Sequence, residues 1–463
     1  MTATDFAIRL CARVRIGIAL LLGLAAVAVV WAGPTVFPTG VTRYDPSKAY
    51  NCDVLFSAPD NRTYLIDMDG NVLHRWDRAG FPAKMLNPVL TGGVKGEIGV
   101  QLALVPAGSK AGQIGLVPGQ HGIFRDLTFG YLDWTGKAVW QWGTQAPGGA
   151  ALQHHDWDLL SNGDTLLLAN KVGRLKGFGT RVMLDPVIYE VNKAGRIVWI
   201  WRASNHLDEF GFTPAQLKLI RSGKAADYLH FNDMEVLGPN HWAKSGDARF
   251  APDNILISSR NANFIAIISR ETGKIVWRVG PDFASQGYRE GPSAHKVPFK
   301  LDHFSGQHDA HMIPEGLSGA GNILIFDNEG EGGYPPAAMP LIGGSRVLEF
   351  NPVTRMVVWE YTGTKATFFS PFISSAQRLP NGNTLIDEGI WGRFFQVTPK
   401  GKIVWEYVSP FVGSGTGAGS GSVRWIYRIQ AVPYDWVPNG VPHSEVPVRP
   451  PTRADFHIAQ SKN

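Results

Sequence analysis

Residues 188–201 read IYEVNKAGRIVWIW, and this stretch decides the fold because its pattern occurs in six places along the chain. An alternating apolar strand leads into a turn at Gly195, and a second strand places Trp199 four residues after the glycine. Glycine readily takes the positive φ angles that tight hairpins need, and alternate apolar residues pack one face of a strand. Each copy is therefore predicted to be a β-hairpin. The other copies span 63–76, 131–142, 266–279, 347–361 and 395–407.

The six copies keep an aromatic residue at one place even where other positions vary. Arg355 stands where the fifth copy would have its turn glycine. Six similar hairpins with flat aromatic side chains between them indicate six small stacked sheets. Four residues after the turn position, the copies carry His74, Trp140, Trp199, Trp277, Trp359 and Trp405.

A second repeated motif supplies further strands, as a turn followed by a segment rich in Leu and Ile. Its copies span 159–170, 253–260, 321–328 and 378–389. Together the two motifs provide the four strands of a propeller blade. We therefore predict an all-β, six-bladed β-propeller over residues 34–440. The segment VRWIYRIQAV (423–432) is expected to complete a blade beside residues 50–57 and so to close the ring.

One insertion between the repeats is predicted to be helical. Thr213 is a natural N-cap, Pro214 suits the first helical position, and Gly223 suits the C-terminal cap. Residues 441–463 are interpreted as a polar C-terminal tail.

The N-terminus has the order of a targeting segment. Arg9, Arg13 and Arg15 precede the uncharged apolar run 16–32, which is followed by Gly33 and Pro34. This order predicts that residues 1–33 are a signal peptide or membrane anchor and that the propeller lies outside the cytoplasm, on the periplasmic or cell-surface side. The run is near the minimum length for a membrane span, while Val30 and Ala32 would permit cleavage, so both forms stay open.

Charge and cysteine content exclude two classes of protein. The formal net charge is only +5, and no cluster of Lys and Arg is suited to following a phosphate backbone, which argues against nucleic-acid binding. The two cysteines, Cys11 and Cys52, flank the apolar run. If that run crosses a membrane they cannot pair, so the chain is not a disulfide scaffold.

Histidine gives the sharpest functional signal. Corresponding strands of a propeller run the same way relative to the central axis, so residues at the same blade position meet in one central funnel. In the last blade the position of His308 is taken by Ser374, so the repeat does not by itself require histidine there. Five of the thirteen histidines stand at strand starts beside the repeats, namely His154, His155, His230, His308 and His311. Three others, His206, His241 and His303, are interpreted as structural.

A metal site is a competing interpretation of these histidines, because clusters of His and Asp bind Zn²⁺. Residues three apart on a strand point to opposite faces, which argues against one ion shared by His308 and His311. The same parity separates His154 from His155. We therefore predict no protein-bound metal.

Several motifs together resemble the PAPS-independent bacterial arylsulfotransferases. They are HHDWDLLSNGDTLLL (154–168), YLHFND (228–233), DNILISSRNANFIAII (253–268), GQHDAHMI (306–313) and RLPNGNTLIDEG (378–389). The resemblance implies a six-bladed propeller that moves a sulfuryl group from an aryl sulfate ester to a phenol through a sulfated histidine, with no cofactor. The site residues that it implies are His155, His230, Asn232, Arg260 and His308, with His308 as the nucleophile.

The implied chemistry agrees with the residue types. A neutral imidazole is a competent nucleophile, and Arg260 offers a planar fork of donors to sulfate oxygens, although a buried structural salt bridge is its plainer interpretation. Asn232 adds a neutral donor, and a further histidine can transfer the phenol's proton. Which of His154 and His155 faces the site stays open.

Three questions stay open beside this hypothesis. A non-catalytic propeller that binds a ligand or partner, and a metal-dependent propeller hydrolase, are the alternative functions. We expect no N-terminal β-sandwich domain, which some members of the family use for dimerisation, and no disulfide beyond the apolar run, so the oligomeric state is open.

The charge order of the N-terminus leads to a topology prediction. A reporter enzyme that works only outside the cytoplasm, fused after Asn463, should be active, because the arginines hold the N-terminus inside. The matched reporter that works only in the cytoplasm should be inactive, and strong activity from it would contradict the prediction.

Overall fold

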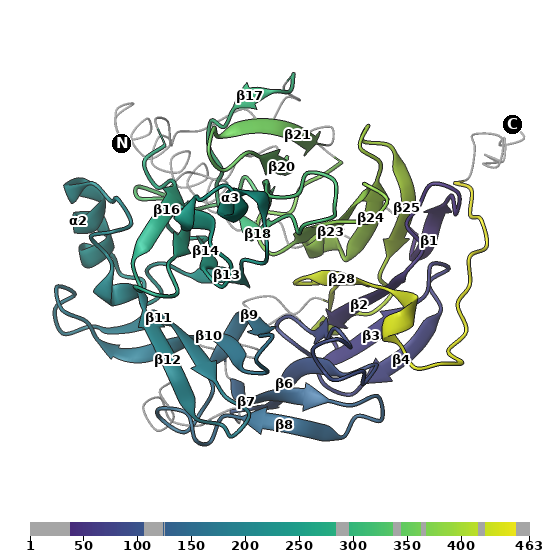
Figure 1. The fold of residues 1–463 in the computed structure, drawn as a ribbon, viewed down its shortest axis with the longest axis horizontal. Helices are drawn as coiled ribbons and strands as arrows, with labels where there is room; N and C mark the ends of the chain where they lie inside the picture. Colours follow the sequence, from purple (N-terminus) through teal and green to yellow (C-terminus); the bar gives the residue numbers. More distant parts are fainter. Residues whose placement is uncertain are drawn as a thin grey trace, which may run out of the picture.

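The computed structural model describes residues 38–105, 124, 126–283, 296–336, 344–362, 367–414 and 422–450. Six small antiparallel sheets stand around a central axis as the blades of a β-propeller (Figure 1). The predicted all-β, six-bladed fold is therefore confirmed. In each blade the first strand given below is the innermost and lies against the axis.

The first three blades hold four strands each. Blade 1 contains β28 (Ile429–Val432), β2 (Asp53–Ala58), β3 (Arg62–Ile66) and β4 (Val72–Trp76). Blade 2 contains β5 (Lys84–Met85), β6 (Ile98–Leu104), β7 (Asp126–Leu132) and β8 (Ala138–Trp142). Blade 3 contains β9 (Gln153–Leu159), β10 (Thr165–Arg174), β11 (Val182–Val191) and β12 (Ile197–Arg202).

Blade 4 also holds four strands, whereas blades 5 and 6 each hold a fifth, outer strand. Blade 4 contains β13 (Phe231–Val236), β14 (Ile255–Ser259), β15 (Phe264–Ile268) and β16 (Ile275–Val279). Blade 5 contains β18 (His308–Met312), β19 (Ile323–Asp327), β20 (Arg346–Phe350), β21 (Met356–Thr362) and β17 (Phe299–Lys300). Blade 6 contains β22 (Ser375–Arg378), β23 (Thr384–Glu388), β24 (Arg393–Val397), β25 (Ile403–Val408) and β1 (Gly40–Tyr44).

The repeated hairpins are the two outermost strands of the four-stranded unit in every blade. Their turn glycines have positive φ, for example 77° at Gly195, and Arg355 takes the same conformation with φ of 58°. The predicted helix is α2 (Pro214–Ser222), and Thr213 forms a capping box with Gln216. Outside the blades lie α3 (His241–Lys244), the 3₁₀ turns η2 (Ala203–Asn205), η3 (Ala248–Phe250), η4 (Gly389–Trp391) and η5 (Tyr434–Trp436), and the hairpin of β26 (Gly413–Ser414) and β27 (Ser422–Val423).

The ring is fastened by strands from both ends of the chain. The C-terminal β28 pairs with β2, with Ile429 opposite Phe56, as the sequence predicted. Figure 1 shows this yellow strand beside the purple one. A second fastening, which was not predicted from the sequence, is the pairing of the N-terminal β1 with β25. Beyond the blades, Val448 forms a bridge with Tyr44.

Tryptophan indoles connect each blade to the next. An indole N–H donates to a backbone carbonyl in the next hairpin turn, at 2.8 Å from Trp201 to Gly273 and at 2.7 Å from Trp405 to Met68. Because Met68 belongs to blade 1, the last bond closes the circle. In the first three blades the donor lies six residues after the turn glycine, two beyond the position that the sequence singled out. The other bonds run from Trp76 to Asp133, Trp142 to Gly195, Trp277 to Pro352 and Trp359 to Pro399.

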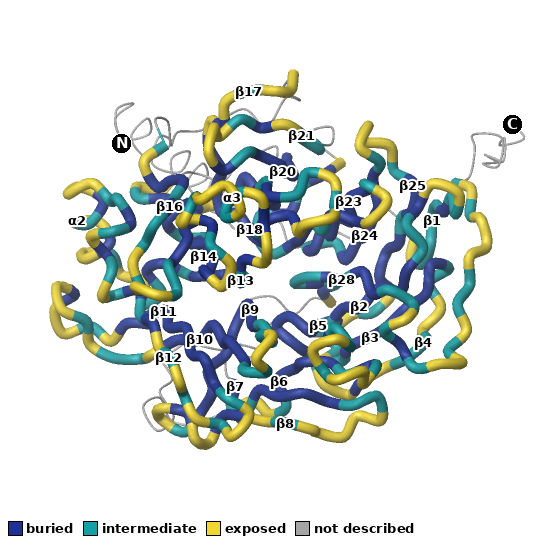
Figure 2. The backbone as a smooth tube through the Cα atoms, viewed as in Figure 1, coloured by how far each residue is buried: buried dark blue, intermediate teal, exposed yellow. Residues whose placement is uncertain are grey.

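Burial follows this arrangement. The inner strands and the faces between blades are buried, and the outer strands and loops are exposed (Figure 2).

Cys52 is a buried free thiol whose pKa is raised by burial. No helix among the described residues has the length and apolar character needed to cross a membrane. The predicted anchor or signal, 16–32, and Cys11 lie outside the described residues.

Candidate active site

One residue from each blade lies at the same place, at the start of the inner strand, as the strand registers show. The six, called here the site ring, are Phe81, His155, Asn232, His308, Ser374 and Tyr427. Three of them are residues that the sequence analysis selected. The other three were not selected, although Tyr427 lies within the predicted closing strand.

Tyr427 contacts the other five members of the site ring. Its ring centroid is 4.4 Å from that of Phe81, 5.4 Å from that of His155 and 6.2 Å from that of His308. Its hydroxyl donates to the backbone carbonyl of Asn232 at 2.6 Å, and its own carbonyl accepts from the Ser374 amide at 3.1 Å. The closing segment therefore organises the site as well as the ring of blades.

Bulges at the strand starts turn consecutive side chains toward the axis. The pairing of β9, β13 and β18 with their neighbours is interrupted at this level, and His155 has φ of 62° while Asp309 has φ of 54°. A bulge breaks the alternation of faces along a strand. The parity argument is therefore wrong for His154 and His155, whose Nδ1 atoms lie 2.7 Å apart.

His308 is held as a neutral imidazole with one defined tautomer. Its Nδ1 lies 2.8 Å from the Asn328 side-chain oxygen and 3.0 Å from the Gly306 carbonyl. Both are acceptors, so Nδ1 carries the proton and Nε2 the lone pair. Accordingly, the Ile373 amide donates to Nε2 at 3.2 Å. Burial, reinforced by the charge of Arg260, holds the pKa of His308 well below its usual range.

Asn328 fixes this tautomer and was missed by the sequence analysis. Its amide nitrogen donates to the carbonyls of Ser370, at 2.7 Å, and Ile373, at 2.8 Å, so its oxygen is the atom turned to His308. The repeats could have identified Asn328. It ends its copy of the second repeated motif, as Arg260 ends another copy, and equivalent positions converge at the axis.

His155 and His230 form a contacting pair with different surroundings. Their ring centroids are 4.7 Å apart. Burial, together with the charges of His230 and His154, keeps the pKa of His155 well below its usual range. His230 instead has a carboxylate partner, because its Nδ1 lies 2.5 Å from Oδ2 of Asp227. Burial raises the pKa of Asp227, but the charge of His230, the hydrogen bonds from His230 and the charge of His154 together lower it overall.

The Asp227–His230 dyad has the geometry of an acid–base group. Asp227 also accepts the backbone N–H of His230 at 3.0 Å, which fixes the two residues to one another. A carboxylate at Nδ1 leaves Nε2 of the imidazole to exchange a proton with another group. The sequence analysis selected His230 but not Asp227, which stands only three residues earlier in the chain.

Arg260 has no carboxylate at ion-pair distance in the described part of the chain, although the charges of Glu331 and Asp227 act on it. Its Nη1 donates to the Asn261 side chain at 3.1 Å, and its charge is strong enough at His308 to depress the pKa of that imidazole. The plainer interpretation as a buried salt bridge is therefore not supported. Fully buried Asn232 donates from Nδ2 to the Gln307 carbonyl at 2.6 Å, while its Oδ1 has no hydrogen-bond partner.

One group of potential metal ligands occurs among the described residues, formed by His303, Asp327 and Glu329. A guanidinium already lies within it, because Nε of Arg346 is 2.9 Å from Asp327. His303 bonds Glu329 through Nε2 at 2.7 Å and Asp302 through Nδ1 at 2.8 Å. These contacts make the group an ion-pair network, consistent with a structural role for His303. His311 lies three residues farther along β18 than His308.

The fold and the site define a six-bladed propeller with a neutral, oriented histidine at its axis and an arginine whose charge acts on that histidine. The sequence profile of the Arylsulfotransferase (ASST) family matches residues 57–409, and the chain belongs to that family. Membership makes it an aryl sulfotransferase in general terms, with aryl sulfates and phenols as its classes of substrate.

Other comparisons are less informative. No curated protein matches the chain. Among solved structures, a protein of unknown function from Bacteroides caccae is 11% identical over 82% of this chain and 98% of its own, with a TM-score of 0.42. Virginiamycin B lyase from Staphylococcus aureus is 11% identical over 81% of this chain and 85% of its own, with a TM-score of 0.35. Similarities at this level carry no argument about activity.

The depressed pKa values lead to a titration prediction. The imidazole signals of His155 and His308 in ¹⁵N–¹H NMR spectra should keep the shifts of neutral rings as the pH falls through about 6.5, where a free histidine gains its proton. A lowered pKa moves protonation to more acidic pH, so both rings should titrate only well below that value. Assignment would use the His155→Ala and His308→Ala proteins, and a midpoint at or above that of free histidine would contradict the prediction.

Proposed function

We propose that the protein transfers a sulfuryl group from an aryl sulfate to a phenol in two steps, through a covalent adduct on Nε2 of His308. The observation that carries the proposal is the fixed tautomer of His308, whose protonated Nδ1 is bonded to Asn328 and Gly306. An unprotonated Nε2 with a lowered pKa is a nucleophile that needs no separate base at neutral pH.

In the first step, Nε2 attacks sulfur, and the bond from sulfur to the aryl oxygen breaks. The Ile373 amide must release its 3.2 Å hydrogen bond so that the lone pair can reach the sulfur. The phenolate leaves with the bonding electron pair and takes a proton from His230. Asp227 is bonded to Nδ1 of His230, which leaves Nε2 of that imidazole to exchange the proton with the phenolate.

In the second step, an acceptor phenol loses its proton to the now neutral His230, and its oxygen attacks the sulfur. The sulfur–nitrogen bond breaks, and its electron pair returns to Nε2. Because the first phenol leaves before the second reacts, the kinetics are ping-pong. His155, 4.7 Å from His230 between ring centroids, adjoins the path of this proton.

Charge on the sulfuryl oxygens needs preorganised donors. Arg260 has a guanidinium without a carboxylate partner among the described residues and acts electrostatically on His308, so we assign it to these oxygens. Asn232 has one N–H engaged by Gln307 and an unpartnered Oδ1. We therefore assign it to the phenolic hydroxyl of the acceptor, which can donate to that oxygen.

The decisive test is mass spectrometry of the protein quenched after reaction with an aryl sulfate donor alone. We expect a mass increase of one SO₃ group on the peptide that contains His308. His308→Ala should lose this increase and nearly all turnover, whereas His311→Ala, on the same inner strand, should keep both. A label on His155 or His230 would contradict the assignment of the nucleophile, and unlabelled protein with sequential kinetics would contradict the covalent route.

The dyad predicts a dependence on the leaving group. Asp227→Asn should lower kcat on the order of 10–100-fold with a donor whose phenol has a pKa of about 10, because this phenolate needs a proton to leave. With 4-nitrophenyl sulfate, whose phenolate leaves readily, the loss should be much smaller. The ratio of the two kcat values measures the effect, and equal losses with both donors would show that Asp227 does not act through proton transfer.

A further inference from the structure

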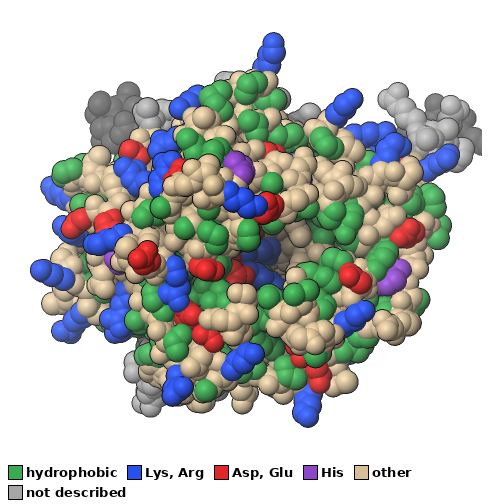
Figure 3. All heavy atoms as spheres, viewed as in Figure 1, with side chains coloured by type: hydrophobic (Ala, Val, Ile, Leu, Met, Phe, Trp, Pro, Cys, Tyr) green, Lys and Arg blue, Asp and Glu red, His purple; other side chains and the backbone are tan. Residues whose placement is uncertain are grey.

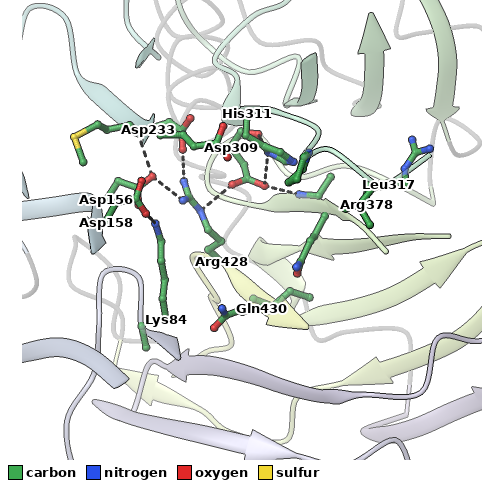
Figure 4. Close-up of a pocket in the computed structure, with 17 residues that line it drawn as sticks. Lys84, Asp156, Asp158, Asp233, Asp309, His311, Leu317, Arg378, Arg428 and Gln430 are labelled. Carbon is green, nitrogen blue, oxygen red and sulfur yellow. Dashed lines mark hydrogen bonds and ion pairs between the residues drawn. The ribbon is translucent and has the colours of Figure 1, made fainter. Parts of the chain in front are cut away.

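A second layer of side chains lies directly below the site ring. Asp156, Asp233 and Asp309 follow His155, Asn232 and His308 in the sequence, and Arg428 follows Tyr427. Figure 4 shows the three carboxylates around the one guanidinium. Arg428 reaches Asp156 through Nη1 at 2.7 Å, Asp233 through Nη2 at 2.7 Å and Asp309 through Nε at 3.1 Å.

This polar layer joins all six blades. Arg428 comes from blade 1 and its carboxylate partners from blades 3, 4 and 5. Blade 2 adds Lys84, whose Nζ lies 2.6 Å from Asp156. Blade 6 adds the backbone amide of Ala376, which donates to Asp309 at 2.8 Å. The Arg428 side chain is only 11% exposed, so water screens these ion pairs weakly.

The polar layer fixes backbone positions at a level where regular strand pairing does not. The regular pairing of β9, β13 and β18 is interrupted at the bulges that hold His155, Asn232 and His308. Each aspartate is one peptide unit from one of these residues, so the position of its carboxylate constrains that residue's backbone. A guanidinium has donors in a fixed plane and can hold several carboxylates in one geometry.

We propose that Arg428 is a positioning residue for sulfuryl transfer. Its planar fork sets the relative positions of His155, Asn232 and His308, although it touches none of the reacting atoms. The consequence for catalysis rests on the proposed function, whereas the consequence for geometry stands without it. A displacement on the order of 1 Å at a reacting group costs about 10²-fold in rate.

A chamber gives solvent access to the far side of Arg428. It has a volume of about 270 Å³, and Asp158, Glu235, His311, Arg378 and Arg428 are among its lining residues. Figure 3 shows the face hollowed at its centre, with basic and acidic side chains within the hollow. A small cation added to the solution can therefore reach the place that the Arg428 side chain occupies.

The first test compares two arginines that line the chamber. Arg428→Lys keeps the charge and removes the fork, and it should lower kcat on the order of 10²-fold at a temperature where the protein is fully folded. The matched control is Arg378→Lys. Arg378 lines the same chamber and pairs with Glu349 at 2.7 Å, but none of the site ring adjoins it in sequence. The control should keep the wild-type kcat even if it melts earlier, and equal kcat values for the two variants would overturn the proposal.

Chemical rescue tests the fork itself. Guanidinium at millimolar concentration should restore kcat to Arg428→Ala, whereas the same concentration of KCl should not. A folded Arg428→Ala protein that guanidinium fails to rescue would overturn the proposal. If Arg428→Ala does not fold, the lysine variant carries the decision.

NMR provides a test that does not depend on turnover. The imidazole signals of His155 and His308 should shift in Arg428→Lys and stay in place in Arg378→Lys. Unmoved signals in Arg428→Lys would overturn the positioning role whatever the activity. A wild-type protein that fails to transfer sulfuryl groups would instead refute the proposed function, so the two failures are distinguishable.

Discussion

Closure of the ring of blades is the constraint on which the rest of the structure depends. Each blade is a small sheet that cannot bury both faces alone, and the indole N–H groups from Trp76 to Trp405 bind each blade to the turn of the next. The last bond returns to Met68. Closure brings the six inner strands to a common axis, where Phe81 and Tyr427, far apart in sequence, lie with their ring centroids 4.4 Å apart.

Much of this fold was predictable, because a short local pattern, with a turn glycine and an aromatic residue at a fixed distance, specifies each repeated hairpin. Arg355 stands in place of the turn glycine and still has the positive φ of the turn, so the fifth hairpin keeps the conformation of the other copies. Strand β1 was not predictable in this way. Its sequence, GVTRY, belongs to no repeat, and it joins blade 6 by backbone pairing with β25, which leaves no side-chain pattern to read.

The site was predictable in its conspicuous residues and less so in their partners. The structure brings His155 beside His230, and it places Arg260 where its charge acts on His308. Asp227 and Asn328, which orient two of these imidazoles, are ordinary residues whose roles follow only from three-dimensional contacts. Strand parity failed at His154 and His155 because a bulge formed by non-glycine residues has no signature in one sequence.

The site ring also has a consequence for how such proteins can diversify. Each of its six members ends a loop on a separate but similar sheet, so one member can be exchanged without a change in the backbone that carries the others. Phe81 and Ser374 have no part in the proposed bond making, yet both contact Tyr427, Phe81 through its ring and Ser374 through its backbone amide. A substitution at either position would leave the hydrogen bonds that orient His308 in place. Members of the site ring can thus change on one blade while those on the other blades keep their positions.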